Sequence, residues 1–155
     1  MKLGLRLPQR LGVDLQHDVV EAARTAEAAG YASLWTYERL LFPKSPLEPY
    51  APPNVPWPEH SRQVADSLAV LTAAAVATEQ VRLGTALLIA AQHTPVQLAK
   101  ALATIDQISG GRMIAGMAPA GPATIFGPLA PPGRIAAASS TRRWTSLTPC
   151  GGRTR

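Results

Sequence analysis

Short apolar runs alternate along this chain with longer stretches in which apolar residues recur at helical spacing. The clearest example begins with Leu83–Ala90, an apolar run with almost no alternation, which is typical of a parallel strand covered on both faces. Leu98, Leu102 and Ile105 then recur at helical spacing, and a second apolar run follows at 113–117. This order predicts a strand, a helix and a second strand, which together make one βαβ crossover.

The junctions of this crossover carry signals of their own. Thr94 can cap the helix because its hydroxyl accepts a hydrogen bond from one of the first backbone N–H groups. Pro95 suits the first helical position because the N–H that it lacks has no partner there. Gly110 and Gly111 are typical of a helix end, since glycine adopts the left-handed conformation without a steric clash. We therefore expect the helix to begin at Pro95 and to end before Gly110.

Two strands and two helices are predicted nearer the amino terminus. The strands are expected at 2–7 and 31–37, and the helices at 19–30 and 61–78. Asp14 or Asp18 is expected to cap the first of these helices, and Asp66 lies near the start of the second, where the helix dipole favours a carboxylate. Four strands and three helices in strict alternation predict an α/β fold with a parallel sheet.

The segment LGTALLIAAQHTPVQLAKALATIDQISGGRMIAG, at 83–116, resembles the signature of the luciferase-like monooxygenase superfamily, in particular its F420-dependent branch. The resemblance covers about residues 1–117. It implies a (β/α)8 TIM barrel, present here only as an N-terminal half with about four parallel strands and three helices, since a complete barrel takes about 250 residues. It also implies an oxidoreductase or monooxygenase that transfers hydride or activates oxygen on a small organic substrate. The implied cofactor is coenzyme F420, or alternatively FMN.

The resemblance places a cofactor against the third strand. Family members hold the cofactor ring at a bulge that contains a cis peptide bond without proline, and the matching step here is Ala86 to Leu87. Gly84 and Thr85 are small neighbours that let a ring approach the backbone. These four residues are therefore the cofactor-binding candidates, and the alternative is an ordinary buried strand.

Three residues are candidates for catalysis. Many relatives place an acidic residue followed by histidine after the second strand, where this chain has Glu38 followed by Arg39. Arg39 can pair with an anionic cofactor or substrate, but its permanent charge excludes general acid or base catalysis. His93 lies beside the start of the third helix, on the presumed catalytic face. The alternatives are a Glu38–Arg39 ion pair at the surface and a solvated loop histidine.

A long proline-rich connection at 38–60 separates the second strand from the next helix. Loops of this length are usually functional or disordered, and in a βα barrel the loop after a strand lies on the catalytic face. We interpret it as a substrate-side loop, and the alternative is a plain surface excursion.

The chain changes character after Met117. Residues 1–117 contain ten basic and ten acidic residues, whereas 118–155 contain five arginines and no acid, so the tail carries the whole net charge of +5. We expect a half-barrel domain at 1–117 and a disordered tail at 118–155. A shifted reading of the tail codons permits Gly-Trp-Ser-x-Asp-Asp-Phe, which is how family members continue. We therefore hypothesise a frameshift near Met117 and expect little or no turnover, because the family's phosphate-binding elements lie largely in the later half.

The composition limits which other sites and partners can be expected for this chain. Cys150 is the single cysteine, which excludes an internal disulfide and a multi-cysteine metal site, and the three histidines lack metal-ligand spacing, so no metal is expected. We expect a cytoplasmic protein without membrane attachment, because neither a signal peptide nor an apolar span is evident. No nucleic acid is expected, since the basic tail lacks lysine clusters. The alternative to an enzyme is a non-catalytic half-barrel that forms a homodimer through its exposed sheet edge.

Overall fold

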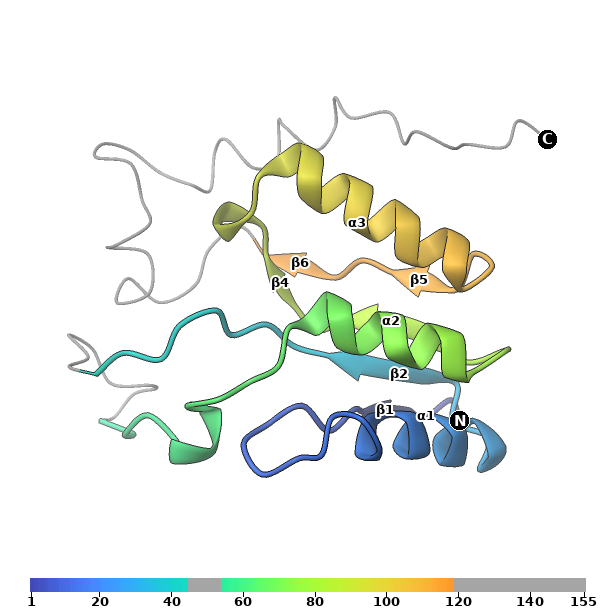
Figure 1. Ribbon diagram of the computed structural model, residues 1–155, viewed down its shortest axis with the longest axis horizontal. Coiled ribbons are helices and arrows are strands. Elements are labelled where there is room, and N and C mark those ends of the chain that lie inside the picture. Colours follow the sequence, from blue (N-terminus) through green and yellow to red (C-terminus); the bar gives the residue numbers. More distant parts are fainter. Residues whose placement is uncertain (45–53, 119–155) are drawn as a thin grey trace.

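The computed structural model describes residues 1–44 and 54–118. Within them, four parallel strands form one sheet in the order in which they occur along the chain (Figure 1). The strands are β1 (Gly4–Arg6), β2 (Ser33–Thr36), β3 (Arg82–Thr85) and β5 (Met113–Ile114). The predicted α/β fold with a parallel sheet is therefore confirmed. The tail at 119–155 and the middle of the proline-rich connection at 45–53 lie outside the described residues.

Three helices cover one face of this sheet. They are α1 (Asp18–Ala28), α2 (Ser67–Ala77) and α3 (Pro95–Ile108), and two short 3-10 turns, η1 (Glu59–Ser61) and η2 (Ala90–Gln92), precede α2 and α3. Buried residues of α1 and α2 pack with strand residues in one cluster, and α3 contributes to a second. Met113 of β5 packs against both clusters, so all three helices share the same face. None of the helices in the described ranges is long and apolar enough to cross a bilayer.

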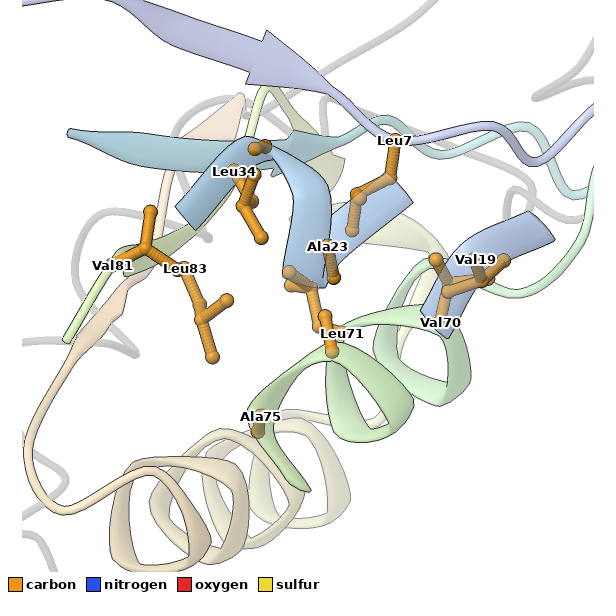
Figure 2. Packing of buried hydrophobic residues seen from close by; sticks show 11 residues of the cluster. Leu7, Val19, Ala23, Leu34, Val70, Leu71, Ala75, Val81 and Leu83 are labelled. Atoms are coloured by element: carbon orange, nitrogen blue, oxygen red, sulfur yellow. The ribbon is translucent and has the colours of Figure 1, made fainter. Parts of the chain in front are cut away.

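The hydrophobic core follows from the strand register. Leu34 and Leu83 are paired across β2 and β3, and because alternate residues of a strand point to opposite faces, both side chains point toward the helices. Both are fully buried, together with Leu71 of α2. Figure 2 shows these three side chains converging between the sheet and the helices. Burying a leucine stabilises the fold by about 2 kcal/mol, so this row contributes to holding α2 on the sheet.

The next row of residues lies on the opposite face of the sheet. Trp35 is paired there with Gly84 of β3, and its indole N–H donates to Ser33 Oγ at 2.8 Å. A Cβ atom added at Gly4 or at Gly84 would clash with the Trp35 ring. Glycine at both positions therefore lets the indole lie across three strands, and it covers the open face of the sheet over β1 and β3.

The prediction of one continuous strand at Leu83–Ala90 was wrong. It is divided into β3 and β4 (Leu88–Ile89), just as the run at 113–117 is divided into β5 and β6 (Met117–Ala118). The backbone changes hydrogen-bond partners at the break. The N–H of Ala86 donates to Thr36 on one side, whereas the N–H of Leu88 donates to Gly116 on the other. As a result β4 pairs with β6 in a separate two-stranded ladder.

Several helix starts differ from the prediction. The helix expected at 61–78 begins at Ser67, because the Asp66 carboxylate caps it by accepting from the N–H groups of Leu68 and Ala69. His17, rather than Asp14 or Asp18, is the N-cap of α1, and it makes no side-chain cap.

Thr94 is the N-cap of α3, as expected, and Pro95 is its first residue, but the Thr94 hydroxyl makes no capping hydrogen bond. The Thr94 carbonyl accepts from the N–H of Leu98, which is the first regular hydrogen bond of the helix.

Arg112 fastens β5 to the carboxyl end of α2. Its guanidinium donates to the carbonyls of Ala75, Thr78 and Val81 at 2.8–2.9 Å, and to the carbonyl of Ser109 at 2.6 Å. It also donates to the Thr78 hydroxyl at 2.9 Å. The last carbonyls of a helix lack partners within the helix. One cation therefore satisfies these acceptors and opposes the negative end of the helix dipole.

Glu27 makes the corresponding link from the end of α1. Its carboxylate accepts from the backbone N–H groups of Glu79, Gln80 and Val81 at 2.7–3.1 Å. Burial acts to raise the pKa of Glu27, but these three hydrogen bonds and the nearby Arg112 charge outweigh it, so the pKa is lowered. The carboxylate thus fixes the entry into β3.

Replacing Arg112 tests this link. Arg112→Met keeps the apolar stem but leaves partly buried carbonyls without a donor, and we expect the free energy of unfolding to fall by about 3 kcal/mol. Urea denaturation measures the change. Arg82→Met is the matched control because Arg82 is exposed on the neighbouring strand, and it should change stability by about 0.5 kcal/mol or less. Equal stability of the two variants would contradict the role of Arg112.

Candidate functional site

Two of the three candidate catalytic residues, Glu38 and His93, meet at the carboxyl ends of the parallel strands. Glu38 follows β2, the Ala86–Leu87 step follows β3, and His93 follows η2. Parallel pairing brings these strand ends to the same edge of the sheet, where ligands bind in folds of this class. This edge is on the left in Figure 1, where the arrowheads of β2, β5 and β6 point.

Glu38 is the centre of the site. Its Oε1 lies 2.6 Å from His93 Nε2, and its Oε2 accepts from the N–H of Ile89 at 2.6 Å. Its own N–H donates to the Leu87 carbonyl at 3.2 Å. The Glu38 side chain is 8% exposed. One carboxylate thus joins the end of β2 to the bulge and to the segment before α3, and it pairs with His93 rather than with Arg39 at the surface.

His93 is held by this carboxylate, so it is not a simply solvated loop residue. The hydrogen bond that His93 donates to the Glu38 carboxylate raises the pKa of His93, burial lowers it, and the charges of Glu38 and Asp66 raise it further. The net direction is upward from the ordinary value of 6.5. The nearly buried carboxylate therefore favours the imidazolium form of His93 more than water does for a free imidazole.

The bulge has the geometry that the family resemblance implied. The Ala86–Leu87 peptide bond is cis. Both residues are exposed, and Leu87 is 42% accessible to solvent. Thr85 is buried and exchanges hydrogen bonds with Gly116, donating to its carbonyl and accepting from its N–H. Gly84 lies under the Trp35 ring. Ala86 and Leu87 are therefore the two of the four candidates that a ligand can reach.

Arg39 lies in a different part of this edge. Its guanidinium stacks over the Trp57 ring at 4.9 Å. It also lines a cleft formed by the loops after β1 and β2 and the segment before α2, and His93 is not among the residues that line this cleft. The structure therefore brings together Glu38, His93 and the bulge, but it does not place Arg39 in the same group.

Gln9 is a residue of this edge that the sequence did not indicate. Its side chain is buried, donates to the carbonyls of Tyr37 and Ala65 and accepts from the Tyr37 N–H. It holds the ends of β1 and β2 and the segment before α2 at fixed positions. All of its partners are backbone groups, which any residue carries, so no sequence pattern marks the contact.

Gln92 is a second residue that the sequence did not indicate. Both polar atoms of its side chain are buried and make no hydrogen bond within the described part of the chain. A buried amide without a partner costs about 1–3 kcal/mol, and no sequence pattern marks it, because the lack of a partner arises only in the folded chain. Among the described residues no three His, Cys, Asp or Glu side chains gather to hold a metal ion.

Replacing Glu38 tests the pair. Glu38→Gln removes the charge that stabilises the imidazolium, so we expect the pKa of His93 to fall relative to the native chain. Because the folded-state pKa is raised, the pair stabilises the fold fully below pH 6.5, and this contribution is lost as the pH rises through the raised pKa. NMR titration of the imidazole resonances measures the shift. Glu79→Gln, at the opposite end of the sheet, should leave the His93 titration as it is, and an unchanged titration in Glu38→Gln would contradict the assignment.

Solved structures similar to this chain include one determined with FMN and one that depends on coenzyme F420. The monooxygenase RslO1 of Streptomyces bottropensis has a TM-score of 0.66 at 24% identity, over 94% of this chain and 40% of that one. The oxygenating constituent of 3,6-diketocamphane monooxygenase of Pseudomonas putida, solved with FMN, has a TM-score of 0.67 at 15% identity, over 94% and 38%. The coenzyme F420-dependent tetrahydromethanopterin reductase of Methanopyrus kandleri has 0.58 at 26%, over 83% and 29%. The described fold is that of part of a TIM barrel.

Curated relatives include uncharacterized proteins of Mycobacterium tuberculosis and Mycobacterium bovis, each 32% identical over 99 residues. The match covers 62% of this chain, and the chain spans only 35% of the length of these relatives. The model of the luciferase-like monooxygenase family matches residues 1–138, which is most of the chain. The chain therefore belongs to the luciferase-like monooxygenase family.

Proposed function

We propose that this chain is the N-terminal part of a flavin-type oxidoreductase and that the edge formed by Glu38, His93 and the bulge receives the cofactor ring. Coenzyme F420 is the proposed cofactor and FMN the alternative, since solved relatives use one or the other. The observation that carries the proposal is the Glu38 carboxylate, which holds Ile89 and His93 at 2.6 Å beside the exposed Leu87.

The residues at this edge suit such a ring. A flavin or deazaflavin presents a flat apolar face and an edge of carbonyl and N–H groups. Leu87 and Ala86 offer exposed apolar surface for the face. The amide of Gln92 carries two N–H donors and a carbonyl acceptor that make no hydrogen bond within the described residues, which suits the polar edge.

In the proposed site, Glu38 positions the imidazole of His93 and His93 holds a proton. When bound, the cofactor supplies hydride transfer or oxygen activation. Glu38 binds Nε2 of His93 and thereby fixes the orientation of the imidazole, which leaves Nδ1 on the other side of the ring to donate to a ligand when the ring is protonated. The raised pKa of His93 means that the ring keeps this proton to a higher pH than a free imidazole does. Arg39 keeps its permanent charge and takes no part in proton transfer.

The proposed activity belongs to a longer enzyme. The chain spans between 29% and 40% of the length of the solved relatives described above. We therefore propose that the isolated chain binds the cofactor ring weakly and shows little or no turnover on a small organic substrate.

Cofactor binding tests this proposal. We expect the purified chain to quench the fluorescence of F420, or of FMN, in a saturable titration. Leu87→Asp should weaken binding by about tenfold, since it removes one apolar side chain from the ring face. Val76→Asp is the matched control because Val76 is an exposed apolar residue on α2, remote from the strand ends. The Val76→Asp variant should bind the cofactor as tightly as the native chain does.

Two outcomes of the titration would contradict the proposal. One is equal weakening by Leu87→Asp and Val76→Asp, which would show that binding is not at the bulge. The other is binding of neither cofactor by a chain that elutes as a discrete dimer in size-exclusion chromatography. That result would favour a half-barrel that associates with a second copy. The candidate contacts are then the two outer strands of the sheet, β1 and β5, each of which has one side unpaired within the described residues.

A further inference from the structure

The side chain of Gln9 continues the pairing of β1 with β2 beyond the ends of the two strands. The N–H of Leu7, just after β1, donates to the Trp35 carbonyl at 2.9 Å. Two residues beyond Trp35, the Gln9 side chain replaces the backbone of β1. Its Oε1 accepts from the Tyr37 N–H at 3.0 Å, and its Nε2 donates to the Tyr37 carbonyl at 2.8 Å. One side-chain amide therefore binds both polar groups of the Tyr37 backbone, as a neighbouring strand would.

The next residue, Glu38, is bound from the other side of the same segment. Its N–H donates to the Leu87 carbonyl at 3.2 Å. This alternation is expected, because successive residues of an extended chain direct their backbone groups to opposite sides. The Glu38 backbone thus depends on the residues after β3, whereas Tyr37, one position earlier, depends on Gln9.

Gln9 also binds the segment before α2. Its Nε2 donates to the Ala65 carbonyl at 3.2 Å, and its own backbone carbonyl accepts from the Ala65 N–H at 2.8 Å. Ser67 joins this segment to the end of β2, since its hydroxyl donates to the Tyr37 carbonyl at 2.7 Å. Gln9 and Ser67 are only 1% and 2% exposed, so water has little access to these side chains. The three segments are therefore held together by a buried polar network.

Each of the two residues that the Gln9 amide binds directly precedes an acidic residue in the sequence. These acids are Glu38 and Asp66. Glu38 raises the pKa of His93 through its hydrogen bond at 2.6 Å and its charge, against the lowering effect of burial, and the charge of Asp66 raises this pKa further. The backbone positions of both acids that act on His93 thus depend on one buried amide.

We propose that Gln9 is a positioning residue for the Glu38–His93 pair. Its amide fixes the Tyr37 peptide, and Glu38 then presents its carboxylate to His93 and to the Ile89 N–H. Within the described residues only Gln9 binds the Tyr37 N–H, so without the amide the strand end shifts and the contact to His93 lengthens. That the positioned pair serves catalysis rests on the proposed function, whereas the link from Gln9 to the pair rests on the geometry.

Replacing Gln9 tests the proposal. Gln9→Met keeps a side chain of similar length but removes the amide that binds the Tyr37 peptide. We expect the pKa of His93 to fall, to a value between that in the native chain and that in Glu38→Gln, because the carboxylate remains but is less well placed. NMR titration of the imidazole measures this pKa, and a His93→Asn variant identifies its resonance among those of the three histidines.

Two comparisons separate positioning from a general loss of stability. Arg112→Met removes a hydrogen-bonding side chain at the opposite end of the sheet, so it should destabilise the chain but leave the His93 titration as it is. In Gln9→Met/Glu38→Gln the pKa should lie close to that in Glu38→Gln alone, since only the smaller effect of Asp66 remains. An unchanged titration in Gln9→Met, an equal fall in Arg112→Met, or a full additional fall in the double variant would overturn the proposal.

Ser67→Ala provides the test if circular dichroism shows that Gln9→Met does not fold. It removes the second donor to the Tyr37 carbonyl and leaves Gln9 in place. The pKa of His93 should again fall, and an unchanged pKa would contradict the proposal. None of these titrations contains F420 or FMN, so a failure of cofactor binding and a failure of the Gln9 link are observed separately.

Discussion

Parallel pairing of β2 with β3 determines which residues face the helices and which end of the sheet carries the functional groups. In one row Leu34 lies beside Leu83 and is buried under α2, and in the next row Trp35 lies beside Gly84 on the open face. The same register brings the residues that follow each strand to a common edge. Glu38, two residues beyond β2, therefore reaches Ile89 and His93 beyond β3, although 55 positions separate Glu38 from His93 in the sequence.

The two edges of the sheet use charged side chains for different purposes. At the amino edge, Arg112 and Glu27 form hydrogen bonds with backbone groups. These bonds join the ends of helices to the starts of strands. At the carboxyl edge, Glu38 binds a backbone N–H with one oxygen but a titratable side chain with the other. This division agrees with the general property of βα barrels, in which one end stabilises the fold and the other holds the chemistry.

The sequence predicted the elements that depend on local chemistry. Pro95 at the start of α3, the glycines after it and the Ala86–Leu87 step were all located correctly, because each is marked by its own residue type or by the family pattern. The break between β3 and β4 was missed, since an apolar run does not reveal a change of hydrogen-bond partner. The contact between Glu38 and His93 was also missed, because it depends on strand register, and Gln9 and Arg112 bind carbonyl groups that no sequence distinguishes.

The central claim is that a flavin-type ring lies at the bulge beside Glu38 and His93. The most direct measurement is a heteronuclear NMR titration of the ¹⁵N-labelled chain with F420 and with FMN, because chemical shifts locate even weak binding residue by residue. The account predicts that the largest shifts occur at Leu87, Ile89 and Gln92 and at the His93 imidazole, with little change along α1 and α2. Shifts concentrated on the helical face, or none up to the solubility limit of either cofactor, would contradict it.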